Sequence, residues 1–246
     1  MPSVLFDFFQ WDFGFFHRYH ANFDHPDFLM KSLPKSGLVL LNGRRPSKSL
    51  LLRFWQRVDC RVCADGAAKI LFEYELTPDI ILGDLDSVTS SVIRAFPDTR
   101  ILKNPDQSTT DGEKAFQFCL ENHLRNIYVL GALGKRSDHW LYNIGLLRKE
   151  RFRDLRLNLY SDTEEILLVR QHIELYEKIG TSISLMPVFG PIKGVTTKGL
   201  AYPLTNDLLE FGGISSISNY FSEPSVSIDF PSGEILVLIN RLEKEG

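Results

Sequence analysis

The hydrophobic pattern changes character once along this 246-residue chain, and the change predicts two domains of different fold class. From Gly37 to Arg148, short apolar runs alternate with segments in which apolar residues recur at helical spacing. Strands separated by helices predict a mainly parallel sheet with helices on both faces. After Leu155 no helical segment of any length follows, and apolar residues alternate with polar ones. This second pattern predicts an antiparallel all-β domain, either a sandwich or a barrel.

The spacing also predicts the individual elements. In the first domain we expect strands at 38–41, 61–64, 79–82, 100–102, 127–130, 155–160 and 165–169. Helices are expected at 47–57, 67–75, 111–121 and 138–148, and a further helix capped by Thr89 runs to Phe96. In the second domain we expect strands at 173–176, 182–187, 195–202, 214–218, 225–230 and 235–239. The predicted domains are therefore 37–170 and 171–246, preceded by an extension at 1–36.

The extension is rich in phenylalanine and carries no motif that indicates a role. Asp7, Asp12 and Asp24 interrupt its apolar residues, so it does not read as a secretory signal, and its acidic residues do not suit a mitochondrial presequence. Its three histidines, at positions 17, 20 and 25, lack the supporting residues of a metal site. We expect it to pack aromatic side chains on the domain that follows.

Composition excludes several classes of partner. The net charge is −3 and no long run of Lys or Arg occurs, so nucleic acid is not expected as a partner. No apolar stretch approaches the ~18 residues of a membrane span, so no membrane partner is expected. The three cysteines are few and odd in number, which indicates a reducing compartment and a cytoplasmic location. Cys60 and Cys63 would face opposite sides of a strand, so we interpret them as core residues.

Aspartates follow several of the predicted strands, and this placement carries most of the functional information. Because the carboxyl ends of parallel strands meet at one edge of a sheet, where open α/β folds bind ligands, these side chains should converge. Converging carboxylates repel one another unless a cation lies between them, and Mg²⁺ prefers oxygen ligands and accompanies phosphates. The pattern therefore predicts a metal–nucleotide site. The aspartates concerned are Asp65, Asp84, Asp86, Asp111 and Asp138.

Each motif also has an ordinary structural explanation. Asp84 and Asp86 would lie on one side of an extended chain, but G-D-L-D-S could also be a hydrated turn. Asp65 could cap the following helix instead of facing a metal. Thr110 and Glu113 have the spacing of a capping box at the start of the helix that carries Asp111. Neither a P-loop nor a G-x-G-x-x-G motif is present.

The loop at 131–138 contains glycines and two cations and precedes a predicted helix. Arg136 in this loop is suited to gripping two phosphate oxygens, although a plain surface loop would also account for the sequence. In order along the chain, the segments C-A-D-G-A, G-D-L-D-S, P-D-Q-S-T-T-D and G-A-L-G-K-R-S-D resemble those of thiamine pyrophosphokinases. T-T-K-G-L-A-Y-P-L-T-N-D at 196–207 and S-S-I-S-N at 215–219 resemble the second domain of that family. The resemblance spans Leu38 to Arg241 and is greatest to eukaryotic members.

The resemblance implies a reaction and an architecture. The family transfers pyrophosphate from ATP to the hydroxyl of thiamine with Mg²⁺, giving thiamine diphosphate and AMP. It combines an α/β nucleotide-binding domain with a β-sandwich domain and works as a homodimer, with thiamine bound between subunits. The first domain here would thus bind Mg–ATP, and the second would bind thiamine and dimerise.

The resemblance also implies roles for single residues. The Mg–ATP carboxylates would be Asp65, Asp84, Asp86 and Asp111. Gln107, Thr110, Arg136 and Asp138 would line the nucleotide and the reacting centre, with Asn42 near the nucleotide. Tyr202 would stack on the thiamine pyrimidine, and hydrogen bonds would come from Ser216, Ser218 and Asn219.

Physical chemistry agrees with this reading but leaves alternatives open. Attack of an alcohol on phosphorus needs charge neutralisation and alignment, which a carboxylate-held Mg²⁺ supplies. Either Asp111 or Asp138 could accept the hydroxyl proton. A metal-dependent hydrolase, a kinase acting on another small alcohol, and a non-catalytic nucleotide sensor are the rival interpretations.

Overall fold

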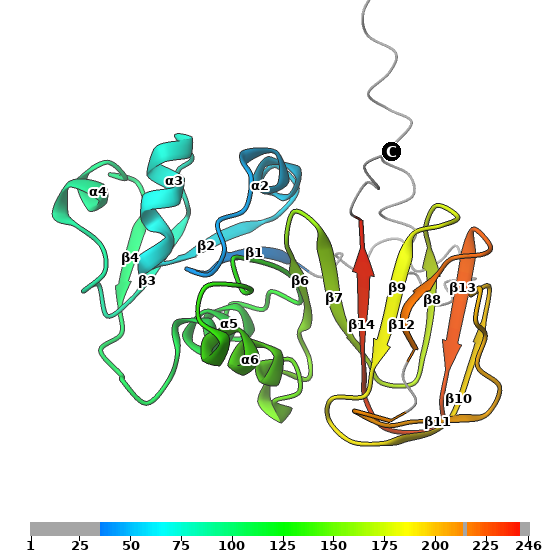
Figure 1. Ribbon diagram of the computed structural model, residues 1–246. Helices are drawn as coiled ribbons and strands as arrows, with labels where there is room; N and C mark the ends of the chain where they lie inside the picture. The colour runs from blue at the N-terminus through cyan, green and yellow to red at the C-terminus, as the bar shows by residue number, and fades with distance from the viewer. Residues whose placement is uncertain (1–34, 214–215, 242–246) are drawn as a thin grey trace, which may run out of the picture. The chain divides into compact units, whose positions relative to one another are not determined.

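The computed structural model describes residues 35–213 and 216–241, and the chain divides into two compact units with a boundary between Leu168 and Val169. Each unit is considered by itself (Figure 1). Almost all of the aromatic-rich extension, and the first two residues of the strand expected at 214–218, lie outside the described residues. Among the helices described, none has the length and apolar character needed to span a membrane.

The first unit contains one mixed sheet, with strands in the order β7-β6-β5-β1-β2-β3-β4. All neighbours are parallel except β6 and β7, which are antiparallel. The strands are β1 (Ser36–Leu40), β2 (Cys60–Ala64), β3 (Ile80–Gly83), β4 (Arg100–Lys103), β5 (Asn126–Leu130), β6 (Arg156–Tyr160) and β7 (Glu164–Val169).

Helices lie on both faces of this sheet, as the alternating pattern predicts. Figure 1 shows α2 and α3 on one face and α5 and α6 on the other. The helices are α2 (Lys48–Trp55), α3 (Ala68–Tyr74), α4 (Ser90–Arg94), α5 (Asp111–Glu121) and α6 (Ser137–Leu146), with short 3₁₀ helices at Asp65–Ala67 and Glu150–Phe152.

Local signals explain where several of these helices begin. The Ser47 hydroxyl accepts a hydrogen bond from the Leu50 amide, and the Thr89 hydroxyl accepts one from Val92 in the same way. Thr89 is therefore confirmed as a helix cap. On α2, Leu51 and Phe54 are buried, and Phe54 stacks on Tyr128 of β5 with ring centroids 4.8 Å apart. Helical spacing of apolar residues thus places an aromatic contact against the sheet.

The strand order reverses at β1, which lies between β2 and β5. In open α/β sheets such a switch point marks the crevice where ligands bind. The loops that follow β1 and β5 are joined there by backbone hydrogen bonds, from Gly43 N to Gly131 O (2.7 Å) and from Arg44 N to Leu133 O (2.6 Å). Gly131 has a φ of +68°, and a Cβ atom there would lie 2.1 Å from the Leu41 carbonyl oxygen. Glycine is required for this close approach of the two loops.

The second unit consists of antiparallel strands in the orders β12-β9-β14 and β11-β10-β13-β8. Burial alternates along β9 and β13, as expected for strands with one face on a core. The strands are β8 (His172–Tyr176), β9 (Ser182–Met186), β10 (Ile192–Lys198), β11 (Asp207–Leu209), β12 (Ser216–Tyr220), β13 (Ser225–Asp229) and β14 (Ile235–Asn240).

Three strands of this unit differ from the prediction. The strand expected at 195–202 ends at Lys198, because Gly199 has a φ of +77° and a Cβ atom there would lie 2.1 Å from the Ser225 carbonyl oxygen. Strand β11 was not expected, and β12 continues to Tyr220 beyond the expected end at Ser218. As a result Tyr202 lies in a loop and not in a strand.

Candidate functional site

Asp65 follows β2 at the carboxyl edge of the parallel sheet and is only 2% exposed. Its carboxylate accepts hydrogen bonds from the Gly66 amide (2.5 Å) and the Leu85 amide (2.7 Å), so it links the ends of β2 and β3. A Cβ atom on Gly83 would lie 2.5 Å from the Asp65 Cγ, which explains the glycine at the end of β3. Burial and the nearby charge of Asp111 raise the pKa of Asp65, although both amides oppose this.

The segment after Gly83 is a turn, so of the two interpretations of G-D-L-D-S the extended chain is wrong and the turn is confirmed. Leu85 has a φ of +67°, and the Asp86 amide donates to the Asp84 carboxylate at 3.1 Å. The strand rule that would place Asp84 and Asp86 on one side therefore does not apply. Asp84 also accepts from the Gln107 side chain at 3.1 Å, and hydrogen bonds from Asp86 and Gln107 lower its pKa.

Asp111 is the first residue of α5, as predicted, and Thr110 is its N-cap. Gly112 fits this start because a Cβ atom there would lie 3.0 Å from the Asn143 Oδ1. Burial raises the pKa of Asp111; the charge of Asp84 adds to the rise, and Lys114 opposes it. Asp65, Asp84 and Asp111 are therefore close enough to affect one another's charge, at the ends of β2 and β3 and the start of α5.

Lys114 is a residue that the sequence analysis missed. Its side chain is buried, 6% exposed, and its Nζ donates to the Asn104 carbonyl at 3.1 Å. It also lowers the pKa of Asp84 and Asp111 through its charge. Its position three residues after Asp111 on a helix was the available signal, since such residues are neighbours on one helix face.

Not all of the carboxylates predicted for the site lie together in the structure. Asp86 is joined to Asp84 through its backbone amide, and the Asp138 side chain pairs with Arg136. Across residues 35–213 and 216–241, no group of three or more His, Cys, Asp or Glu side chains is arranged to hold an ion by itself. The structure by itself therefore does not arrange the aspartates at the sheet edge as a metal site.

Asn42 lies at the switch point and joins three loops. Lys135 Nζ donates to both its carbonyl oxygen and its Oδ1, each at 2.9 Å. A Cβ atom on Gly66 would lie 2.4 Å from the Asn42 Nδ2, so the amide packs tightly against the loop after β2. This places Asn42 between the carboxyl ends of β1 and β2 and the loop after β5.

Arg136, at the N-cap of α6, points its guanidinium at Asp138 in the first turn of that helix. Its Nε donates to the Asp138 carboxylate at 3.1 Å and Nη2 at 2.5 Å, and hydrogen bonding to this guanidinium lowers the pKa of Asp138. The side chains are 71% and 62% exposed, and an exposed ion pair of this kind contributes little to stability. A phosphate could therefore replace Asp138 on Arg136 at small cost.

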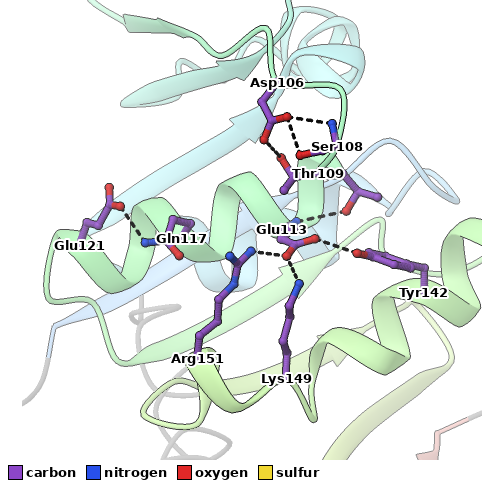
Figure 2. Close-up of polar contacts among 10 residues, drawn as sticks. Asp106, Ser108, Thr109, Glu113, Gln117, Glu121, Tyr142, Lys149 and Arg151 are labelled. Atoms are coloured by element: carbon purple, nitrogen blue, oxygen red, sulfur yellow. Dashed lines mark hydrogen bonds and ion pairs between the residues drawn. The ribbon is translucent and has the colours of Figure 1, made fainter.

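Glu113 is buried at the start of α5, and its environment corrects the predicted capping box. The Thr110 hydroxyl accepts from the Glu113 amide at 3.3 Å, which is half of such a box. The Glu113 carboxylate does not return to Thr110 but receives hydrogen bonds from Tyr142 (2.8 Å), Lys149 and Arg151, as Figure 2 shows. Two cations and a tyrosine from beyond the helix thus hold the turn that carries Asp111.

Replacement of Glu113 by Gln should lower the free energy of unfolding by about 1.5–3 kcal/mol, the usual range for hydrogen bonds to a charged group. Burial by itself raises the pKa of Glu113, but the bonds from Lys149 and Tyr142 and the charge of Arg151 hold it below its usual value. Its contribution is therefore present above the unfolded-state pKa and is lost as the pH falls through the folded-state pKa. Thermal unfolding of both proteins should show a difference that shrinks below about pH 4.

Glu121→Gln is the matched control, because Glu121 lies exposed on the same helix with one bond from Gln117 at 2.7 Å (Figure 2). It should change stability by less than about 0.5 kcal/mol. The role of the ionised Glu113 in stability would be contradicted by equal losses of stability in the two variants. It would also be contradicted if the loss in Glu113→Gln stayed the same in acid.

In the second unit, the residues predicted to bind thiamine differ in exposure. Tyr202 is 66% exposed and contacts Tyr220 edge to face, with ring centroids 6.0 Å apart. Ser218 is exposed and has a φ of +58°, and its amide donates to Ser184 Oγ at 3.0 Å. Ser216 and Asn219 are buried, 7% and 2% exposed. The tyrosine ring and Ser218 are thus available to a ligand, whereas Ser216 and Asn219 face inward.

Two family models match the chain, one in each unit. The model described as "Thiamin pyrophosphokinase, catalytic domain" matches residues 51–159, and "Thiamin pyrophosphokinase, vitamin B1 binding domain" matches residues 170–235. The first match contains the aspartates at the sheet edge, and the second contains Tyr202 and strand β12.

Individual proteins are similar over most of their length. "Thiamine pyrophosphokinase 3" of Oryza sativa subsp. japonica is 36% identical, with 81% of this chain and 84% of that protein covered. "Thiamin pyrophosphokinase 1" of Caenorhabditis elegans is 29% identical, with 74% and 79% covered. Crystal structures of thiamine pyrophosphokinases from Bacillus subtilis and yeast share the fold, with TM-scores of 0.77 and 0.75 at 22% identity, covering 85% and 86% of this chain and 100% and 87% of theirs.

Proposed function

The chain belongs to the thiamine pyrophosphokinase family, and we propose that it transfers pyrophosphate from ATP to the hydroxyl of thiamine, giving thiamine diphosphate and AMP with Mg²⁺. Members of this family are thiamine diphosphokinases, and relatives from plants and a worm fit a eukaryotic type. The observation that carries the finer proposal is that Asp65 and Asp84 follow the adjacent strands β2 and β3, which the bond from the Leu85 amide to Asp65 ties together, with Asp111 at the start of α5.

The donor set fits Mg²⁺. The raised pKa values of Asp65 and Asp111 reflect burial and unbalanced negative charge, which a divalent cation would relieve. Mg²⁺ is usually held by one or two carboxylates together with phosphate oxygens and water, so an incomplete protein shell suits it. We assign Asp65, Asp84 and Asp111 to this role, with Asp86 in reach through the same turn. When bound, Mg²⁺ neutralises the charge of the polyphosphate.

The remaining residues of the first unit are assigned to the nucleotide and the reacting groups. Asn42, Gln107 and Thr110 would line ATP at the switch point and the start of α5. Arg136 would leave Asp138 and bind phosphate oxygens, since its present partner is exposed and weakly held. The thiamine oxygen then bonds to the β-phosphorus as the bond to the AMP oxygen breaks, and the hydroxyl proton passes to Asp111 or Asp138.

In the second unit, Tyr202 is assigned to thiamine. Its ring is exposed, so its face can stack on a pyrimidine without loss of core packing. Ser218 offers a hydroxyl at the exposed surface of β12, and Ser216 lies deeper in the same strand. The aromatic ring supplies the stacking surface, the Ser218 hydroxyl supplies direction, and the inward-facing Ser216 would support the site from behind.

Product analysis tests the reaction directly. Purified protein is incubated with Mg–ATP and thiamine, and nucleotides and thiamine esters are separated and identified. Formation of thiamine diphosphate with an equal amount of AMP is expected. ADP with thiamine monophosphate would indicate an ordinary kinase, and AMP or ADP formed without thiamine would indicate a hydrolase. Binding of Mg–ATP without turnover would indicate a nucleotide sensor.

The proposal includes a homodimer in which thiamine lies between subunits. Mixing Tyr202→Ala protomers with Asp84→Asn protomers should then produce dimers that contain one intact site. Activity at low thiamine concentration should rise above the sum of the two parent proteins. No rise, despite subunit exchange demonstrated with differently tagged protomers, would mean that each site lies within one chain.

A cytoplasmic location remains part of the proposal. The small and odd number of cysteines supports it, because few cysteines are typical of proteins in a reducing compartment. Burial raises the pKa of Cys60 to about 11, which makes a reactive thiolate unfavourable there.

A further inference from the structure

Asn219 in β12 uses all of its hydrogen-bonding capacity inside the second unit. Its Oδ1 accepts from the amides of Tyr202 (3.1 Å) and Tyr220 (2.9 Å). Its Nδ2 donates to the Tyr202 carbonyl (2.7 Å) and to Ser216 Oγ (3.0 Å). A side-chain amide has two donors and an oxygen that accepts two bonds, so this set is complete. The buried amide therefore has nothing left to offer a ligand.

Two of these four bonds hold the backbone of Tyr202, one at its amide and one at its carbonyl. Tyr202 lies in a loop after Gly199, beyond the end of β10, and its amide and carbonyl are both fixed by the same side chain. The ring itself remains exposed, and its aromatic contact within the described part of the chain is with Tyr220. The Asn219 side chain thus gives this loop the backbone hydrogen bonds that a neighbouring strand would otherwise provide.

We propose that Asn219 is a positioning residue that sets the direction of the Tyr202 ring for thiamine, and that it does not bind thiamine itself. This inference rests on the proposed role of Tyr202 in thiamine binding. If the ring must be held in one orientation to stack, loss of Asn219 should remove most of the contribution of Tyr202 to thiamine affinity. It should cause no further loss of affinity. The two residues should then act as a unit and not additively.

A double-mutant cycle on the full-length enzyme tests this. Asn219→Ala alone should raise the thiamine KM about 5- to 150-fold, as far as loss of the stacked ring would, while the ATP KM and kcat at saturating thiamine stay within a few-fold. In the Tyr202→Ala background, the same change should raise the thiamine KM by less than about 2-fold, because coupled residues do not add.

The outcomes separate the inference from the proposed function. Fully additive effects on the thiamine KM would show that Asn219 contacts thiamine directly and would overturn the positioning role alone. If Tyr202→Ala leaves the thiamine KM unchanged, both the positioning role of Asn219 and the assignment of Tyr202 to thiamine are overturned. Because Asn219 is buried, Asn219→Ala could fail to fold, and the cycle is then run with Asn219→Asp, which keeps the shape but places a carboxylate against the Tyr202 carbonyl. The same coupling with Tyr202→Ala is expected, and additivity again overturns the inference.

Discussion

Asp111→Asn should lower kcat at least ~100-fold, the scale on which loss of one preorganised charge-stabilising group acts. The folded protein should be at least as stable as the parent when no metal is present. The pKa of Asp111 is raised in the folded state, chiefly by burial, so the folded protein binds that proton more tightly than the unfolded chain. The ionised carboxylate therefore costs stability near neutral pH, and the neutral amide removes this cost.

Asp84→Asn should give a similar loss in kcat but no gain in stability. The Asp84 carboxylate accepts hydrogen bonds from Asp86 and Gln107, which lower its pKa, so its ionised form is favoured by folding. Comparing the two variants by steady-state kinetics and thermal unfolding thus separates a catalytic effect from a folding effect. Near-normal turnover in both would remove the assignment of these aspartates to the metal site.

Asp79→Asn is the matched control for these two variants. Asp79 precedes β3, at the opposite end of the strand from Asp84, and accepts hydrogen bonds from the Arg61 amide (2.7 Å) and guanidinium (3.2 Å). It is partly exposed and lies at the edge of the sheet away from the other aspartates. The kcat of Asp79→Asn should stay within a few-fold of the parent. A larger loss would reveal a general effect of removing a carboxylate from the end of a strand.

Tyr202→Ala should raise the thiamine KM about 5- to 150-fold and leave the ATP KM nearly unchanged, because stacking of a base on an aromatic ring is worth roughly 1–3 kcal/mol. The ring is 66% exposed, so its removal leaves no cavity in the core. Initial rates with each substrate varied at saturating levels of the other provide the measurement.

Tyr202→Phe separates stacking from the tyrosine hydroxyl. It keeps the aromatic face, and no hydrogen bond of the Tyr202 hydroxyl is among those described, so its thiamine KM should remain within a few-fold. A large effect of Tyr202→Phe would mean that the hydroxyl and not the ring face binds thiamine. An equal rise in both KM values for Tyr202→Ala would mean that the residue does not act on thiamine selectively.

Features that depend on residues near one another in the chain could be read from the sequence. The helix at Asp111–Glu121 begins and ends where predicted, and Thr110 and Thr89 cap their helices through hydroxyls three residues before the amides they bind. The alternation of strands and helices likewise predicts a sheet covered on both faces, because it follows from which residues are apolar at which spacing. Such signals require no knowledge of distant parts of the chain.

The features that could not be read from the sequence depend on partners far apart in the chain. The turn at Asp84–Asp86 depends on a positive φ at Leu85, whose amide bonds to Asp65 twenty residues earlier. Glu113 meets Lys149 and Arg151, separated from it by 36 and 38 residues, and so leaves its expected capping role. Asn219 reaches Tyr202, 17 residues away, across a loop that Gly199 starts. A buried polar group must be paired with whatever partners the fold brings near it, because leaving it unpaired costs about 1–3 kcal/mol. The spacing of residues along the chain does not reveal which distant residues these partners are.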